Sequence, residues 1–185
     1  MIDFAFLKVY TYKNFELVKR ESITNMDLES VKKAEQAKSY FYEGYNCAQA
    51  VALAFQEELN IEKETLVKLC SSFGGGMGRL REVCGAVSGM FMVAGMLYGY
   101  ADPREKADKS AHYKLIQELA DQFKQENGSI VCRDLLGVKR DTYVPDDRTK
   151  EYYKKRPCAD LVYQCAKLTQ ELINKKSTSN NIDTL

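Results

Sequence analysis

One stretch of the chain, residues 83–101, contains no charged residue and reads VCGAVSGMFMVAGMLYGYA. Its length raises the question of a membrane span, but four glycines, one serine and two tyrosines make it only modestly hydrophobic. We therefore interpret residues 81–98 as a helix buried at the centre of a soluble core. Small or flexible residues recur along it at spacings of three and four: Gly85, Ser88, Gly89 and Met92. Another backbone can approach this side of the helix closely.

The rest of the chain shows helical patterns separated by turns. Apolar residues recur at intervals of three and four, and Asn46, Ser129 and Pro157 stand where helices are expected to begin. The glycine-rich residues 74–78 predict a sharp turn, and the polar residues 138–155 predict a surface loop with one helical turn. The expected helices cover residues 27–42, 47–59, 63–72, 81–98, 103–127, 130–136 and 157–176. We therefore predict an all-α fold, a single-domain bundle of six or seven helices.

Both ends of the chain differ from this helical domain, which we place at residues 26–176. Residues 1–25 form an N-terminal extension with β-like composition, and Met26 is a candidate for the natural translation start because the amphipathic pattern begins there. Residues 177–185 are rich in serine, threonine and asparagine and predict a disordered tail. An acid, Asp3, stands where a signal peptide needs cations, so we expect a cytoplasmic location.

The charge balance and the cysteine content narrow the function. Among 185 residues, 27 are basic and 26 are acidic, which gives a net charge of +1 and no field to hold nucleic acid. The single histidine, His112, excludes a metal site built from several histidines and most cysteine–histidine catalytic pairs. A chain of this length can bury a core without disulfides. Its six cysteines are therefore more typical of metal binding or catalysis in a reducing cytosol.

Four of the cysteines stand where helices begin: Cys47, Cys84, Cys132 and Cys158. The partial positive charge of a helix's first turn stabilises a thiolate, the form that binds metal or exchanges disulfides. Together, four thiolates carry about four negative charges, which nearby arginines can offset. The arginines expected to do so are Arg79, Arg81, Arg133 and Arg156. We expect the other two cysteines, Cys70 and Cys165, to pack as small apolar side chains.

Five short motifs follow one another along the chain: Tyr-Asn-Cys at 45–47, Gly-Gly-Gly-Met-Gly-Arg at 74–79, Cys-Gly-Ala-Val-Ser-Gly at 84–89, Cys-Arg-Asp-Leu-Leu-Gly at 132–137 and Pro-Cys at 157–158. This set resembles the bacterial and archaeal C-GCAxxG-C-C family over about residues 30–172. Members of that family are described as redox-active, and the resemblance assigns their four cysteines to Cys47, Cys84, Cys132 and Cys158. The split-Soret cytochromes have a similar domain with haem and an iron–sulfur centre. Because this chain lacks Cys-x-x-Cys-His, we expect no covalent haem.

The resemblance and the four thiols together predict a redox function in one of three forms. The preferred form is electron transfer by an iron–sulfur centre, such as a 2Fe–2S cluster, bound by the four cysteines. The second is dithiol–disulfide exchange, in which Cys84 is the expected attacking thiolate. The third is a structural module that binds zinc, although the cysteines lack the close pairs of a zinc ribbon. We expect an unidentified redox protein as partner, neither nucleic acid nor membrane, and leave a homo-oligomer open.

Two glycines of the central helix, Gly85 and Gly89, are expected to belong to this site. Positions without side chains leave room for other sulfur-bearing segments at a crowded helix start. Ordinary close packing of two helices explains the same spacing equally well. The glycine-rich turn at residues 74–78 fits a plain tight turn better than a nest of N–H groups around sulfur or an anion.

Overall fold

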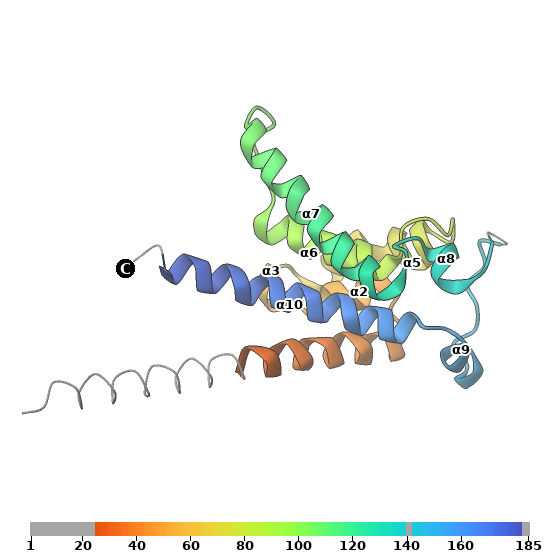
Figure 1. Cartoon of the computed structure of the whole chain (residues 1–185). Helices are drawn as coiled ribbons and strands as arrows, with labels where there is room; N and C mark the ends of the chain where they lie inside the picture. The colour runs from red at the N-terminus through yellow and green to blue at the C-terminus, as the bar shows by residue number, and fades with distance from the viewer. Residues whose placement is uncertain (1–24, 140–141, 183–185) are drawn as a thin grey trace, which may run out of the picture.

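The computed structural model describes residues 25–139 and 142–182. Residues 1–24 of the predicted extension and residues 183–185 of the predicted tail lie outside these ranges. The described chain is helical, with one isolated antiparallel bridge between Val83 and Val131 and no strand. A first helix covers residues 25–42, and the elements after it are α2 (Cys47–Leu53), α3 (Gln56–Leu59), α4 (Lys63–Cys70), η1 (Ser71–Phe73), α5 (Gly74–Met77), α6 (Gly85–Tyr98), α7 (Lys106–Asn127), α8 (Cys132–Leu136), α9 (Lys150–Lys155) and α10 (Cys158–Ile182) (Figure 1). The predicted all-α, single-domain bundle is confirmed.

The uncharged helix α6 lies at the centre of the bundle, as predicted. It packs against α2, α7 and α10, and all six residues from Gly85 to Met90 are buried. The first helix runs antiparallel to α10, since Lys38 pairs with Asp160 near one end of the contact and Asn174 donates to the carbonyl of Met26 near the other. Figure 1 shows these two helices side by side, with α7 projecting away from them. None of the described helices combines the length and apolar character needed to cross a membrane.

The glycines of α6 allow the backbone of α2 to approach closely. A Cβ atom on Gly89 would lie 2.8 Å from the carbonyl oxygen of Ala48, and one on Gly85 would lie 2.7 Å from that of Phe73. Real Cβ atoms essentially never come so close to another heavy atom. The predicted close approach is therefore present, and the neighbour belongs to the same chain.

Four boundaries differ from the sequence predictions by more than two residues. The helix expected from residue 81 begins at Gly85. The helix expected over residues 47–59 is broken at Ala54 and Phe55, and α3 is only one turn long. The helix expected from Pro103 begins at Lys106. The last helix, expected to end at residue 176, continues as α10 to Ile182. Hydroxyl groups extend this helix by donating to carbonyls four residues earlier, as in the 3.0 Å bond from Ser177 to Ile173.

A buried lysine holds the break between α2 and α3. Lys33 is 8% exposed, and its ammonium donates to the carbonyl of Ala54 at 2.9 Å. The same ammonium pairs with Glu58 and lies 5.4 Å from the centre of the Phe55 ring. A charged side chain from the first helix therefore satisfies the carbonyl that the broken helix leaves open.

Candidate functional site

Each of the four predicted cysteines begins or caps a helix, as expected. Cys47, Cys132 and Cys158 are the first residues of α2, α8 and α10, and Cys84 is the N-cap of α6. The four helices come from distant parts of the sequence. The structure nevertheless brings all four cysteines together on the wall of one cavity of about 280 Å³.

The start of α2 is fixed by the predicted cap. The side chain of Asn46 accepts hydrogen bonds from the N–H groups of Ala48 and Gln49, and the side chain of Gln49 accepts one from the N–H of Asn46. The amide of Asn46 also donates to the carbonyl of Ser71 at 3.1 Å. This residue therefore places Cys47 against the glycine-rich turn that follows η1.

A short backbone pairing, which the sequence did not reveal, joins Cys84 to Cys132. The N–H of Cys84 donates to the carbonyl of Ile130 at 2.8 Å, and the N–H of Cys132 donates to that of Glu82 at 2.6 Å. These bonds flank the isolated bridge between Val83 and Val131. The start of α6 and the start of α8 are thereby held side by side.

The glycine-rich turn closes another side of the cavity. Gly76 has φ +71°, and a Cβ atom there would lie 2.6 Å from the Cβ of Cys132. Both the backbone conformation and the lack of space require glycine. Gly85 also lines the cavity, and a Cβ on it would lie 3.2 Å from the Cβ of Cys47. Gly89, the other predicted site glycine, is absent from the cavity wall and packs against α2 instead.

Arginines surround the thiols, although their identity differs from the prediction. Arg79, Arg81 and Arg156 line the cavity, as does Arg148, which the sequence prediction missed. Arg133 does not line it and instead pairs with Glu82 at 2.8 Å on the surface. Arg148 was missed because it lies in a polar segment interpreted as an ordinary surface loop. No local sequence signal distinguishes it from a solvated arginine.

Cys158 is the thiol that the surroundings favour most strongly as thiolate. The hydrogen bond from Cys47 is the largest influence that lowers the pKa of Cys158, and Arg156, Arg148 and Arg81 lower it further, to about 7. The same contact with Cys158, followed by burial, raises the pKa of Cys47 well above its ordinary value. The two thiols therefore share one proton unequally, and the charge resides on Cys158.

The other two thiols are held neutral by burial. Burial raises the pKa of Cys84 to about 12, and the N–H groups of Ala86 and Val87 at the helix start oppose this effect only in part. Burial also raises the pKa of Cys132, although the hydrogen bond from Arg81 acts in the opposite direction. The N–H groups at the start of α6 thus stabilise the Cys84 thiolate as predicted, but less than burial destabilises it. Cys158, rather than the predicted Cys84, is better placed to be an attacking thiolate.

The remaining cysteines lie elsewhere, as predicted. Neither Cys70 nor Cys165 lines the cavity, and both are fully buried. The sulfur of Cys70 lies 3.8 Å from that of Met92. Both thiols therefore pack in the core as small apolar groups.

The four thiols surround the cavity without converging on a single point. Within residues 25–139 and 142–182, no three His, Cys, Asp or Glu side chains are grouped so that they could hold one metal ion. A single zinc ion needs all its sulfur ligands at about 2.3 Å from one centre. The four thiols that line the cavity have the composition of a four-cysteine site.

A comparison with known families gives this site its context. Residues 45–172 match the model of the family described as "Putative redox-active protein (C_GCAxxG_C_C)". The match covers most of the chain and includes all four cysteines of the cavity, so the chain belongs to this family. Comparisons with curated proteins and with solved structures found no match.

Proposed function

We propose that this protein is an electron carrier whose cavity binds an iron–sulfur cluster through Cys47, Cys84, Cys132 and Cys158. The observation that carries the proposal is the meeting of these four cysteines, from four separate helix starts, on the wall of one cavity. They are also the cysteines within the motif set of the family. A function that used only two of them would leave the placement of the other two unexplained.

The donor set suits a cluster better than a zinc ion. Four cysteine thiolates are the usual ligands of both 2Fe–2S and 4Fe–4S clusters. In a cluster these ligands are shared among several iron atoms, so their sulfur atoms lie farther apart than around one ion. The four cysteines also come from widely separated parts of the sequence, without the close Cys-x₂-Cys pairs that are typical of zinc ribbons.

The charges around the cavity support the same proposal. Four bound thiolates concentrate negative charge, and four arginines line the wall beside them: Arg79, Arg81, Arg148 and Arg156. Arg81 is 2% exposed and hydrogen-bonds Cys132, so it acts on the site from within the protein. The leucines Leu135, Leu136 and Leu161 line the cavity as well and limit the access of water. A bound cluster would supply one-electron transfer, while these residues hold its ligands and balance their charge.

Anaerobic purification tests the proposal. The expected result is a coloured protein containing iron and acid-labile sulfide, both lost when Cys132 is replaced by alanine. Cys165→Ala is the matched control, because it removes a buried thiol outside the cavity and should leave the iron content unchanged. Colourless protein after anaerobic expression with iron and after cluster reconstitution, or equal iron loss in both variants, would contradict the proposal.

A second function, dithiol–disulfide exchange, is favoured by one contact. Cys158 and Cys47 line the same cavity, and their thiols interact so that the pKa of Cys158 falls and that of Cys47 rises. The Cys158 thiolate would attack a substrate disulfide, forming a mixed disulfide and releasing one substrate thiolate. Cys47 would then attack the sulfur of Cys158, giving a Cys47–Cys158 disulfide and the second substrate thiol. Two electrons pass to the substrate. Metal-free protein that forms this disulfide reversibly would support exchange over the cluster.

We also propose a reducing cytoplasmic setting and another redox protein as partner. All six cysteines of the chain lie within the described residues, and all are free thiols. Free thiols at this density are typical of proteins kept in a reducing compartment. A carrier without a substrate of its own needs a donor and an acceptor for its electrons. Identification of a protein that reduces the purified chain would test this expectation.

A further inference from the structure

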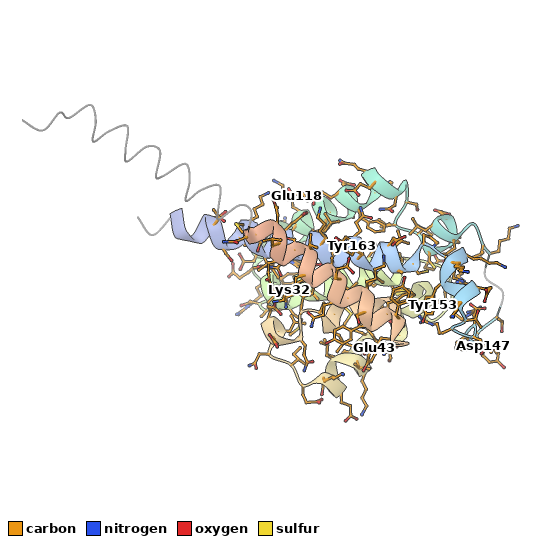
Figure 2. All side chains as sticks on the ribbon, turned by 90° about the horizontal axis from the view of Figure 1, so that it is seen from below. Lys32, Glu43, Glu118, Asp147, Tyr153 and Tyr163 are labelled. Carbon is orange, nitrogen blue, oxygen red and sulfur yellow. The ribbon has the colours of Figure 1, made fainter. Side chains whose placement is uncertain are left out.

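The segment before α9 forms one wall of the cysteine cavity. Residues 142–149, called the lid segment here, have no regular secondary structure. Four of them line the cavity together with the four cysteines: Tyr143, Pro145, Asp146 and Arg148. Figure 2 shows Asp147, within this segment, at one end of the molecule, with Tyr153 of α9 closer to the end of the first helix. The lid segment therefore forms part of the wall that encloses the thiols.

Ion pairs hold the middle of the lid segment in place. The carboxylate of Asp146 accepts hydrogen bonds from Arg79 at 2.7 Å and from Arg156 at 2.9 Å, through the same oxygen atom. Arg79 follows the glycine-rich turn and also donates to the carbonyl of Thr142 at 2.9 Å. Its side chain is only 11% exposed. Asp146 thus joins two cationic parts of the cavity wall to the segment that covers it.

The C-terminal end of the lid segment is anchored separately. Arg148 donates to the carbonyls of Phe41 and Tyr45, both at 3.3 Å, and its guanidinium lies 4.6 Å from the centre of the Phe41 ring. These contacts fix the segment to the end of the first helix and to Tyr45, two residues before Cys47. Arg148 can therefore remain in place when the bridge made by Asp146 is broken.

Apolar packing contributes little to the closed position. No apolar side chain of the lid segment belongs to the hydrophobic core or packs against it, and the contact with the core residue Phe41 is made by the guanidinium of Arg148. Its two most apolar side chains, Tyr143 and Val144, are 89% and 54% exposed. A segment with few buried apolar contacts opens at low free-energy cost once its polar contacts are lost.

We propose that residues 142–149 form a lid over the cysteine cavity, which Asp146 latches closed by bridging Arg79 and Arg156. With the lid closed, Cys84, Cys132 and Cys158 are 5%, 6% and 8% exposed, and Cys47 is half-buried. Electrons can reach a buried centre through its covering, but a thiol, a disulfide or a metal donor must touch the sulfur atoms. Lid opening is therefore the step that admits such a reactant. The lid does not depend on whether the cavity holds a cluster or acts as a dithiol.

Thiol alkylation in the full-length chain tests the latch. The reduced protein, freed of any metal with a chelator, is treated with iodoacetamide at fixed pH, and labelling of Cys47 and Cys158 is followed by mass spectrometry. Asp146→Asn breaks two partly buried ion pairs and should speed labelling of both by about fivefold or more. Asp147→Asn is the matched control, since it removes the next carboxylate in the chain, and should leave the rates unchanged. Equal rates in the two variants would overturn the proposal.

The effect of the mutations on thiolate stability must be separated from their effect on access of the reagent to the thiols. Loss of the Asp146 carboxylate also favours nearby thiolates, which by itself speeds alkylation. Arg156→Gln breaks the same latch but removes a cation that favours the Cys158 thiolate. The lid predicts faster labelling of Cys47 and Cys158 in both variants, whereas a purely electrostatic effect predicts slower labelling of Cys158 in Arg156→Gln. Slower labelling there would overturn the lid.

Amide hydrogen exchange provides a readout that does not depend on the thiols. Exchange across residues 142–149 should accelerate in Asp146→Asn and in Arg156→Gln, and not in Asp147→Asn. Unchanged exchange in the first two variants would also contradict the lid. Cys70, fully buried outside the cavity, reports on global unfolding and should stay unlabelled throughout. If Cys70 becomes labelled in Arg156→Gln, that variant is partly unfolded and Arg79→Gln is used in its place. Arg79→Gln removes the other ion pair of Asp146.

Discussion

The thiol of Cys47 interacts directly with the thiol of Cys158, although one begins α2 and the other begins α10. The contact gives the two cysteines different pKa values. It raises the pKa of Cys47 and lowers that of Cys158 to about 7, with help from three arginines. The chemistry of the metal-free cavity at neutral pH is therefore expected to start at Cys158.

Cys158 should be the first cavity thiol to react in the metal-free, reduced protein. Because alkylation requires thiolate, its rate should rise with pH up to about pH 8 and then level off, following the pKa of about 7. Cys84, with a pKa of about 12, should remain slow and still be accelerating at pH 9. Site-resolved mass spectrometry over pH 5.5–9 measures both profiles.

The hydrogen bond from Cys47 can be removed to test its influence. Cys47→Ala should shift the Cys158 profile to higher pH, because the largest influence lowering this pKa is lost. Cys70→Ala removes a thiol outside the cavity and should leave the profile in place. Faster labelling of Cys84 than of Cys158 at pH 7 would contradict the assignment.

Gly89→Ala should destabilise the protein, because the new methyl group would meet the carbonyl oxygen of Ala48 at 2.8 Å and the side chain of Val51 at 3.0 Å. Such overpacking typically costs about 1–3 kcal/mol in the free energy of unfolding. Gly95→Ala, on the same helix, has no neighbour nearer than 4.0 Å and should be neutral or stabilising by about 0.5–1 kcal/mol. Urea unfolding measures both. Equal effects would show that helix propensity, and not the approach of α2, decides the outcome.

Much of the fold was predictable because helix boundaries are encoded locally. Asn46 caps α2 through bonds from the N–H groups of Ala48 and Gln49, and Gly128 and Gly137 end α7 and α8 with positive φ. The end of α10 was not predictable in this way. Its serine and threonine hydroxyls bond back to the helix, whereas the same residue types also favour disorder.

The sequence was enough to predict which cysteines form the site, but not their pKa values. The four cysteines were found from helix starts and from the motif set, both of which are sequence patterns. The unequal thiol pKa values depend on burial and on the contact between Cys47 and Cys158, which exist only after folding. The bridge from Asp146 to Arg79 likewise joins residues that no local pattern relates.

Gly76→Ala should disturb the cavity itself. The new methyl group would lie 2.6 Å from the Cβ of Cys132 and would occupy a position with φ +71°. Gly128→Ala is the matched control, since its φ is +79° but no atom lies within 4 Å. The control should lose about 1–2 kcal/mol from backbone strain alone. Gly76→Ala should lose about 1–3 kcal/mol more.

The two glycine variants should also differ in metal content. Gly76→Ala displaces Cys132, so iron bound per chain after anaerobic purification should fall well below that of Gly128→Ala at equal folded fraction. Circular dichroism gives the folded fraction, and colorimetric assay gives the iron. Equal iron content would mean that the turn at Gly76 does not position a cluster ligand.

Glu58→Gln should destabilise the bundle through Lys33. Lys33 is 8% exposed, so removing the negative charge of its partner leaves its ammonium with the Ala54 carbonyl and the Phe55 ring. Breaking such a buried pair from one side costs more than a surface pair, and we expect about 1–3 kcal/mol. The matched control is Glu118→Gln, which breaks the pair with Lys114 on the surface of α7, where the side chains are 51% and 79% exposed. That change should stay within about 0.5 kcal/mol. Urea unfolding at pH 7 compares the two, and an equal loss in both would show that the Lys33 ammonium reaches water when its partner is removed.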